Sequence, residues 1–400
     1  MAADTGADQA GAGSSAQYRS ARWALLFGNF AIGCGVMVTA GVLNDIVRSL
    51  QVSVALGGQL ISAAAVVMAL GSPLLAALLS GWDKRRLLVL ALLWYAALHL
   101  LSAVMPSYTA LLPLRCLCML GAAAFTPQAA AAISALAAPQ DRGRAITFVF
   151  LGWSLASVLG MPLSAYVGET FGWRWAFAGV ALVALSAAAG ILRSVPTGIR
   201  SPPLSLGDWR HVFTSPLLML VVAVTALSSA GQFTLFSYFA PYYSQVLGAS
   251  AAQIGMLFLW FGAVGVVGNV IVARHIDRIG AATAVALMLG CMAVSMLAWP
   301  LAVGMGSALL VTAPWALGCF SSNSAQQARL ALAAPPLATA LISLNSSAMY
   351  VGQFAGAASG GAMIAARDFA GLNWAALAWM LLALGASVWA ARRMAHAKHA

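Results

Sequence analysis

Residues 81–131 read GWDKRRLLVLALLWYAALHLLSAVMPSYTALLPLRCLCMLGAAAFTPQAAA. In this stretch a basic turn precedes two apolar runs, at about 87–105 and 109–131, which a short segment with Pro106 separates. A helix needs about 20 apolar residues to cross the hydrocarbon core of a bilayer, so each run is long enough. The stretch therefore predicts two transmembrane helices that are joined by a tight turn.

The same pattern continues along the whole chain. Of the 400 residues, 62% are hydrophobic and only 7% are charged, against roughly 25% charged residues in soluble domains. We therefore expect an all-α membrane protein with twelve transmembrane helices in two parallel six-helix halves. Apolar runs bounded by charges, Pro or Gly predict these helices at about 22–44, 57–79, 87–105, 109–131, 145–168, 175–193, 216–240, 252–273, 281–301, 305–327, 337–361 and 372–391.

The net charge of +11 raises the question of a nucleic-acid partner, and the placement of the charges answers it. With twelve helices both termini lie on one side of the membrane, and sixteen of the twenty Lys and Arg residues fall on that side. Arg48, Arg174 and Arg367 fall on the other side, and Arg115 lies inside a helix. This asymmetry follows the positive-inside rule. It predicts a multi-pass membrane protein with both termini cytoplasmic, in contact with lipid and not with nucleic acid; for a bacterial protein the membrane is then the inner one.

A long polar interruption containing Pro196 divides the chain after the sixth predicted helix. The hexapeptide LQVSVA at 50–55 is echoed by LGASAA at 247–252, before the second and the eighth helix, which suggests an internal duplication. The predicted parts are a disordered cytoplasmic tail at 1–20, six-helix halves at 21–193 and 216–392, a central cytoplasmic loop at 194–215 and a cytoplasmic tail at 393–400.

Four motifs resemble those of a known transporter family. They are the charged turns Gly81–Arg86 and Asp277–Gly280, the fourth helix with Arg115, Gly121 and Pro127, the basic turn Asp141–Ala145, and the fifth helix with Gly152, Gly160, Pro162 and the closing Gly172–Arg174. Together they resemble the twelve-helix drug:proton antiporter group of the major facilitator superfamily, especially its bacterial members similar to arabinose efflux permeases.

The resemblance implies a monomeric secondary transporter that exports a small organic solute in exchange for protons by alternating access. It assigns proton coupling to Arg115. The other residues that it implicates are Asp83, Arg85, Arg86, Asp277 and Arg278 at a cytoplasmic gate, and Gly152, Gly160 and Pro162 in the antiporter motif of the fifth helix.

Small residues recur at every fourth position in the fifth helix, from Gly152 to Gly168, and in the eleventh helix at Gly352, Gly356 and Gly360. Such stripes let helices approach closely. Two interpretations stay open, a smooth contact between rocking halves and static close packing. Pro162 is expected to bend the fifth helix, because proline lacks the N–H of a helical hydrogen bond.

Arg115 is the formal charge that the predicted spans place inside the hydrocarbon. An unpaired arginine there costs at least about 2.5 kcal/mol, so its side chain must face polar groups or water. In a functional role it would set the protonation of a nearby acid or hold an anionic part of the substrate. In a structural role it would bond helix carbonyl groups.

The proton carrier is harder to identify, because none of the nine acidic residues falls in mid-membrane. Asp45, near the outer end of the first helix, is a candidate, and its alternative role is that of a helix terminus at the surface. His99 in the third helix has a side chain whose ordinary pKa lies near neutrality. Its alternative role is that of a hydrogen-bonded core residue.

A substrate cavity combines apolar walls with a few polar groups. With no acid at depth, a neutral or weakly polar solute is expected rather than a permanent cation. Aromatic residues in membrane helices also serve packing or the lipid belt. The candidates, chosen by residue type and depth, are Asn29, Gln59, Gln128, Trp153, Gln232, Phe236, Tyr238, Trp260, Asn269, Trp315, Asn323 and Gln353.

Enzyme classes lack support in the sequence. There is no Gly-x-x-x-x-Gly-Lys-Ser/Thr loop, no His-Glu-x-x-His pair and no Gly-x-Ser-x-Gly turn, so no metal or cofactor is expected. A solute importer, a uniporter, a channel or a non-transporting sensor on the same fold stays open, because a fold does not fix a function.

The topology is directly testable. Reporters fused after Arg200 and after Ala400 should both report the cytoplasm, and a reporter at Arg367 should report the exterior, because an even number of helices separates the first two positions. Enzymatic reporters active on only one side of the membrane measure this. Opposite sides for Arg200 and Ala400 would contradict the twelve-helix arrangement.

Overall fold

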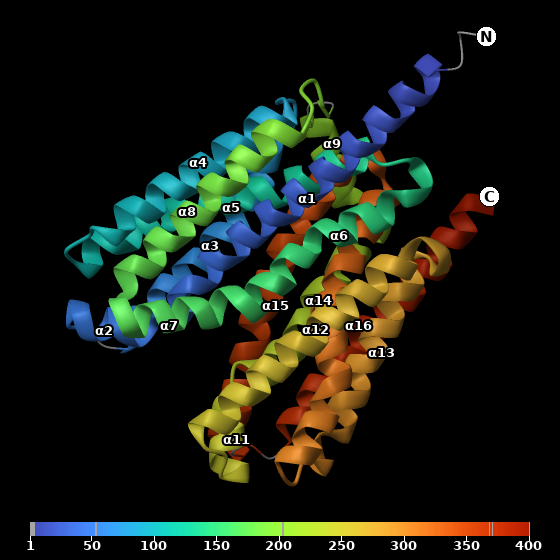
Figure 1. Cartoon of the computed structure of the whole chain (residues 1–400). Helices are drawn as coiled ribbons and strands as arrows, with labels where there is room; N and C mark the ends of the chain where they lie inside the picture. The colour runs from blue at the N-terminus through green and yellow to red at the C-terminus, as the bar shows by residue number, and fades with distance from the viewer. Residues whose placement is uncertain (1–4, 53, 202–203, 368, 370, 400) are drawn as a thin grey trace. The chain divides into compact units, whose positions relative to one another are not determined.

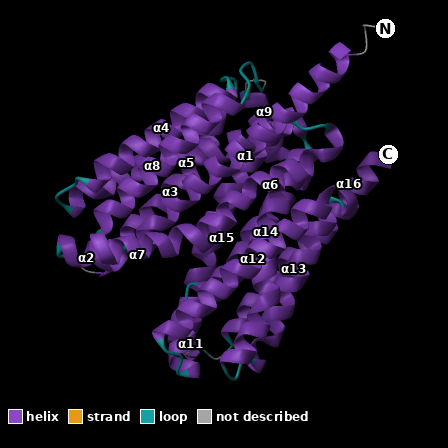
Figure 2. Ribbon diagram, in the orientation of Figure 1, coloured by secondary structure: helices purple, strands orange, loops and turns teal. Residues whose placement is uncertain are grey.

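We describe residues 5–52, 54–201, 204–367, 369 and 371–399 of a computed structural model (Figure 1). In these ranges helices account for the regular structure, and short loops and turns connect them (Figure 2). The chain forms two compact units. Unit 1 comprises residues 1–67 and 74–203, and unit 2 comprises residues 68–73 and 204–400.

The helices of the N-terminal part correspond to the first six predicted spans (Figure 1). They are α1 (Thr5–Gly41), the short α2 (Leu43–Leu50), α3 (Val54–Leu79), α4 (Lys84–Ala103), α5 (Tyr108–Leu136), α6 (Arg142–Leu155), the π-helical segment η2 (Ala156–Gly160), α7 (Met161–Phe171) and α8 (Trp173–Ser194).

The C-terminal part repeats this order with different short helices. It contains α9 (Leu206–Thr214), α10 (Pro216–Phe236), α11 (Phe239–Leu247), α12 (Ala251–Ile279), α13 (Ala281–Ala298), α14 (Met305–Ala333), α15 (Ala338–Arg367) and α16 (Leu372–His399). Three-residue 3₁₀ turns lie at Pro139–Asp141, Trp299–Leu301 and Pro335–Leu337.

Within the described residues, eleven helical stretches are long and apolar enough to cross a membrane. The run Pro139–Phe171, which joins α6, η2 and α7, counts as one of them. The remaining predicted span, the eleventh at 337–361, corresponds to α15, which has 30 residues and is long enough but more polar. Its polar residues include Ser343, Asn345 and Gln353.

Two elements differ from the sequence predictions in a physically clear way. α1 begins at Thr5, so the Ala- and Gly-containing tail continues the first helix instead of being irregular. Alanine has the highest helix propensity, which favours this extension. The fifth helix is interrupted by the wider turns of η2 just before Pro162, which lies in the first turn of α7. The expected effect of the proline therefore takes the form of a π-helical segment.

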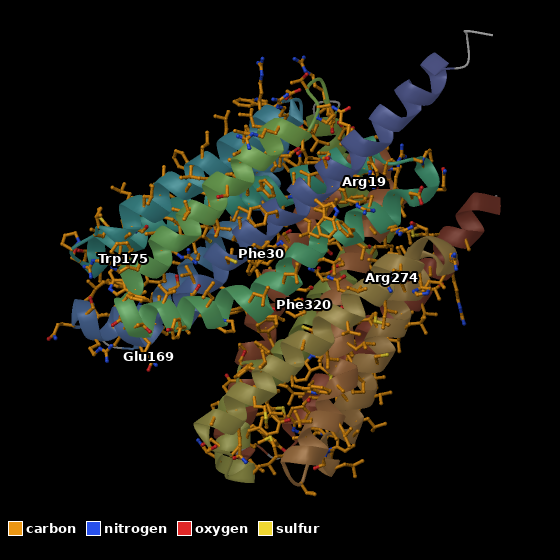
Figure 3. All side chains as sticks on the ribbon, in the orientation of Figure 1. Arg19, Phe30, Glu169, Trp175, Arg274 and Phe320 are labelled. Carbon is orange, nitrogen blue, oxygen red and sulfur yellow. The ribbon has the colours of Figure 1, made fainter. Side chains whose placement is uncertain are left out.

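Small residues set the helix distances inside each unit. A Cβ atom on Gly152 would lie 2.4 Å from the carbonyl oxygen of Leu26, and one on Gly160 would lie 2.5 Å from the sulfur of Cys34. Both glycines thus face α1 of the same unit (Figure 3 marks Phe30 on that helix). The stripe on the fifth helix therefore serves close packing within unit 1, which was one of its two interpretations.

The stripe on α15 packs in the same way within unit 2. Cβ atoms on Gly352 and Gly356 would lie 2.1 and 2.2 Å from the carbonyl oxygens of Ala226 and Ala230 on α10. No real Cβ atom tolerates such distances to a backbone atom, so α10 and α15 touch backbone to backbone.

Gly356→Ala should destabilise the protein, because the added methyl group forces α10 and α15 apart. Overpacking of this kind costs about 1–3 kcal/mol. Gly385→Ala is the matched control, since Gly385 on α16 has nothing within 4 Å of a Cβ position and gains helix propensity. We expect a lower melting temperature for Gly356→Ala only, measured on protein in detergent. Equal melting temperatures would contradict the close contact.

Candidate functional site

Arg115, on α5, is the central charged group of unit 1, with only 1% of its surface exposed. Its Nη2 atom donates a hydrogen bond of 2.9 Å to the carbonyl oxygen of Val36 on α1. Its guanidinium carbon lies 6.0 Å from the ring centre of Phe177 on α8. Nε and Nη1 are buried without a hydrogen-bond partner, and no carboxylate among the described residues forms an ion pair with Arg115. The side chain thus brings a positive charge into the core of unit 1 and leaves it partly unpaired.

His99, on α4, lies in the same core and is fully buried. Its Nδ1 atom lies 2.8 Å from the carbonyl oxygen of Tyr95 and 3.0 Å from the sulfur of Cys118. A carbonyl oxygen can only accept, so the contact with Tyr95 places a proton on Nδ1. The positive charge of Arg115 acts on the ring electrostatically, and Nε2 is buried without a hydrogen-bond partner among the described residues. The structure therefore brings His99 and Arg115 together, although His99 has the hydrogen bonds of a core residue.

Asp45 does not join this cluster but lies on α2. Its Oδ2 atom accepts a hydrogen bond of 2.7 Å from the backbone N–H of Trp173 at the start of α8, and its Oδ1 atom lies 2.9 Å from Nη2 of Arg48. The Trp173 indole and Arg174 both donate to the hydroxyl of Ser49. A carboxylate at a helix N-terminus offsets the helix dipole. These contacts support the alternative role of Asp45, that of a helix-end residue.

Asp83, between α3 and α4, ties the first charged turn to the segment that follows α8. Its side chain accepts from the backbone N–H of Arg86 at 3.0 Å and from that of Gly198 at 2.6 Å, and the N–H of Lys84 donates to the carbonyl oxygen of Ile199 at 2.9 Å. We call the contacts of Asp83 and Lys84 with Gly198 and Ile199 the strap. Partial burial raises the pKa of Asp83, but the two N–H groups and the nearby arginines outweigh this and lower it below its usual value.

Lys84 is a buried residue that the sequence predictions missed. Its side chain is fully buried, and Nζ donates to the carbonyl oxygen of Ser80 at 2.6 Å and to Oε1 of Gln128 at 2.7 Å. A signal was available, because Lys84 lies at helical spacing before the buried Leu87, Leu88 and Ala91. Of the other expected gate residues, Arg85 is half-buried and Arg86, Asp277 and Arg278 are exposed.

A second buried arginine was also missed, because its position near the end of α14 suggested a basic loop. Only 4% of Arg329 is exposed. Its Nη1 donates to the hydroxyl of Ser387 on α16 at 2.8 Å, and its Nη2 donates to the carbonyl oxygen of Ser387 at 3.1 Å. Arg329 thus joins α14 to α16 within unit 2.

The cavity candidates of unit 1 fall into two groups. Asn29 is fully buried, donates to the carbonyl oxygen of Val149 at 3.2 Å and accepts from Thr126, and Gln128 is held by Lys84. These contacts connect helices and leave little for a solute. Trp153 is half-buried, and Gln59 is exposed and accepts from Tyr108 at 3.0 Å.

The candidates of unit 2 divide in the same way. Phe236 and Trp315 belong to an aromatic cluster with Phe239 and Phe261. Tyr238 donates to the carbonyl oxygen of Ala357 at 2.7 Å, which fixes it against α15. The remaining candidates are Gln232 and Asn269, which are buried, Asn323 and Gln353, which are half-buried, and Trp260, which is exposed and donates to the carbonyl oxygen of Leu309.

Comparison with known proteins places this arrangement in a family. The family described as the Major Facilitator Superfamily matches residues 25–357. The uncharacterised MFS-type transporter YbcL of Bacillus subtilis is 25% identical over 361 residues, which cover 90% of this chain and 93% of that protein. The inner membrane transport protein YdhP of Escherichia coli K12 is 28% identical over 86% of this chain and 88% of that protein.

A chloramphenicol resistance protein of Streptomyces lividans is 32% identical over 252 residues, which cover 62% of this chain and 64% of that protein. Among solved structures, the human organic anion transporter MFSD10 has a TM-score of 0.76 at 17% identity, covering 93% of this chain and 99% of that one. The proton:xylose symporter XylE has a TM-score of 0.71 at 16% identity, covering 93% and 95%. Both confirm the fold.

The family match, the curated relatives and the helical fold agree with the transporter predicted from the sequence. The chain belongs to the Major Facilitator Superfamily and is a secondary transporter of the membrane, not an enzyme.

Proposed function

We propose that this transporter exports a small organic solute in exchange for protons, by alternating access of two six-helix halves at 21–193 and 216–392. Both termini would lie in the cytoplasm of a bacterial cell, and one chain would suffice. The observation that carries the coupling is Arg115, a buried positive charge without a carboxylate partner among the described residues. Such a residue inside a membrane helix marks a functional site by default.

His99 is the titratable side chain best placed to exchange a proton near Arg115. Its ring lies in the same core and feels the charge of the guanidinium. Protonation of His99 would add a second positive charge beside Arg115, so each proton that binds changes the electrostatics of the same cluster. Asp45 is the weaker candidate, because its two oxygen atoms are engaged by Trp173 and Arg48.

Efflux of a drug-like solute is supported by the chloramphenicol resistance protein among the relatives. Residues that contact the solute need exposed polar or aromatic surface. Trp153 on α6, Asn323 on α14 and Gln353 on α15 are half-buried and meet this requirement. None of the cavity candidates named from the sequence carries a carboxylate, which favours a neutral or weakly polar solute over a permanent cation.

The strap supports a gating role for the first charged turn. It joins the start of α4 to the segment after α8, so movement of either one stretches the hydrogen bonds of Asp83 and Lys84. Asp277 and Arg278 at the end of α12 are exposed, and we assign them a weaker part in the gate.

Arg115→Lys should keep much of the folded protein yet alter the pH dependence of export, because an ammonium lacks the planar guanidinium and its five donors. Arg115→Ala should reduce proton-driven export more than it reduces folded protein. The measurement is transport in liposomes under an imposed pH gradient, normalised to folded protein.

Arg329→Lys provides the control for that experiment, because Arg329 is also buried but is bonded to Ser387 in unit 2. We expect it to lower stability and leave the pH profile of transport unchanged. A parallel loss of protein and activity in the Arg115 variants, with an unchanged pH profile, would rule out coupling. Uptake driven by the same gradient would instead identify an importer.

Asp83→Asn should loosen the strap, because a neutral amide accepts the N–H groups of Gly198 and Arg86 more weakly than a carboxylate does. Amide hydrogen exchange at Gly198 should speed up several-fold. Asp208→Asn is the matched control, since Asp208 accepts from Ser205 at the start of α9, outside the strap. Exchange at Gly198 that does not change would contradict the strap.

The same measurement has a defined pH dependence. The pKa of Asp83 is lowered, so the stabilisation from its carboxylate is present above the ordinary Asp pKa of about 4 and is lost as the pH falls through the lower folded value. The strap should therefore stay closed throughout the neutral range.

A further inference from the structure

The unpaired hydrogen-bond donors of the Arg115 guanidinium require an explanation beyond proton coupling. A guanidinium carries five N–H donors, one on Nε and two on each Nη atom. Nε and Nη1 of Arg115 are buried without a partner, so at least three of those five N–H groups have no acceptor among the described residues. Each unsatisfied buried donor costs about 1–3 kcal/mol, and more when the group is charged.

Thr39 on α1 adds an unpaired donor on the same side. Ile32 and Val36 accept from Tyr95 and Arg115, and Thr39 follows Val36 by three residues, so the three lie on one face of the helix. Thr39 is fully buried, and its hydroxyl has no hydrogen-bond partner.

Three other buried threonines of the described residues have a hydrogen-bond partner for their hydroxyl, unlike Thr39. Thr147, Thr234 and Thr312 each donate to the carbonyl oxygen four residues earlier, at 2.8 to 2.9 Å. This local bond is the ordinary solution for a helical threonine. Thr39 does not form it, and no described residue pairs with its hydroxyl.

A partner for the free N–H groups of Arg115 must be a hydrogen-bond acceptor, and two arguments indicate that it carries a negative charge. A water molecule would accept from the N–H groups but would leave the positive charge unbalanced in a low-dielectric core. Asp45 is the nearest acid along the chain from Thr39, and its oxygens are already taken by Trp173 and Arg48. The contact with Phe177, at 6.0 Å, is too long to replace a counter-ion.

We propose that Arg115 and Thr39 bind a small monovalent inorganic anion of the halide class, such as chloride, inside unit 1. The anion balances the guanidinium and accepts from Nη1 of Arg115 and from the Thr39 hydroxyl. The inference concerns the resting protein and stands whether or not export is coupled to protons.

The test is the melting temperature of the full-length protein in detergent. Chloride replaces gluconate in steps, at constant ionic strength and pH. A ligand that binds only the folded state stabilises it in a saturable way, so we expect the melting temperature to rise by about 3 °C and then level off. Bromide should act like chloride. An acetate arm tests whether the site instead prefers an organic carboxylate.

Thr39→Val keeps the shape of the side chain and removes only the hydroxyl, so the chloride concentration for half the effect should rise about tenfold. Arg115→Gln should abolish the effect. Arg329→Gln is the control, because it removes another buried arginine, whose Nη1 and Nη2 atoms both bond to Ser387, and it should keep the chloride effect.

Equilibrium dialysis with radiolabelled chloride then measures binding itself, and Thr39→Val decides the outcome if Arg115→Gln does not fold. The proposal fails if chloride and gluconate give the same melting temperature, or if Thr39→Val binds chloride as tightly as the natural protein. It also fails if acetate replaces chloride fully, or if Arg329→Gln removes the effect. These results are independent of transport, so a failure of proton coupling in liposomes leaves them unchanged.

Discussion

The hydrocarbon core of a bilayer offers no hydrogen bonds, and this constraint governs the structure. Each polar group at depth must find a partner in the chain. The carbonyl oxygens of α1 serve this purpose in unit 1, where Ile32 accepts from Tyr95 and Val36 accepts from Arg115. Lys84 is satisfied in the same way by Ser80 and Gln128. Among the buried groups that lack a partner in the described residues, Arg115 differs from the neutral ones because it brings a full charge into the middle of a membrane helix.

Close packing is the second consequence of the same environment. Water does not drive membrane helices together, so they associate through backbone contact. Glycines on the fifth helix and on α15 allow this contact with α1 and α10. The spacing in the sequence predicted close contact but not its partner, because every side of a membrane helix is apolar and the pattern does not indicate a facing helix. In the structure, these glycines pack against helices of their own unit.

The sequence predicted the helices well and the site only in part, because a helix span and a site depend on different properties of the chain. A span depends on local length and apolarity, so α4, α5 and α12 begin and end within a few residues of their predictions except at polar extensions. A site depends on the direction of side chains. Arg115 was found because it interrupts an apolar run, whereas Lys84 and Arg329 were missed because they stand beside other polar residues at helix ends. Asn29 and Gln128 had the right chemistry for a cavity, but contacts between helices hold them.

The two units share an order of helices but not a distribution of charge. In unit 2, Arg329 satisfies two of its nitrogen atoms on a single serine, and the turn with Asp277 and Arg278 is exposed. In unit 1, Asp83 and Lys84 are held by the strap and by buried acceptors, and Arg115 keeps free donors beside His99. In a transporter that moves both halves together, protonation of a residue in one half is enough to shift the equilibrium between the conformations. The second half needs no proton site of its own. Under the proposed proton coupling, this bias would act through the partly unpaired charge of Arg115 in unit 1.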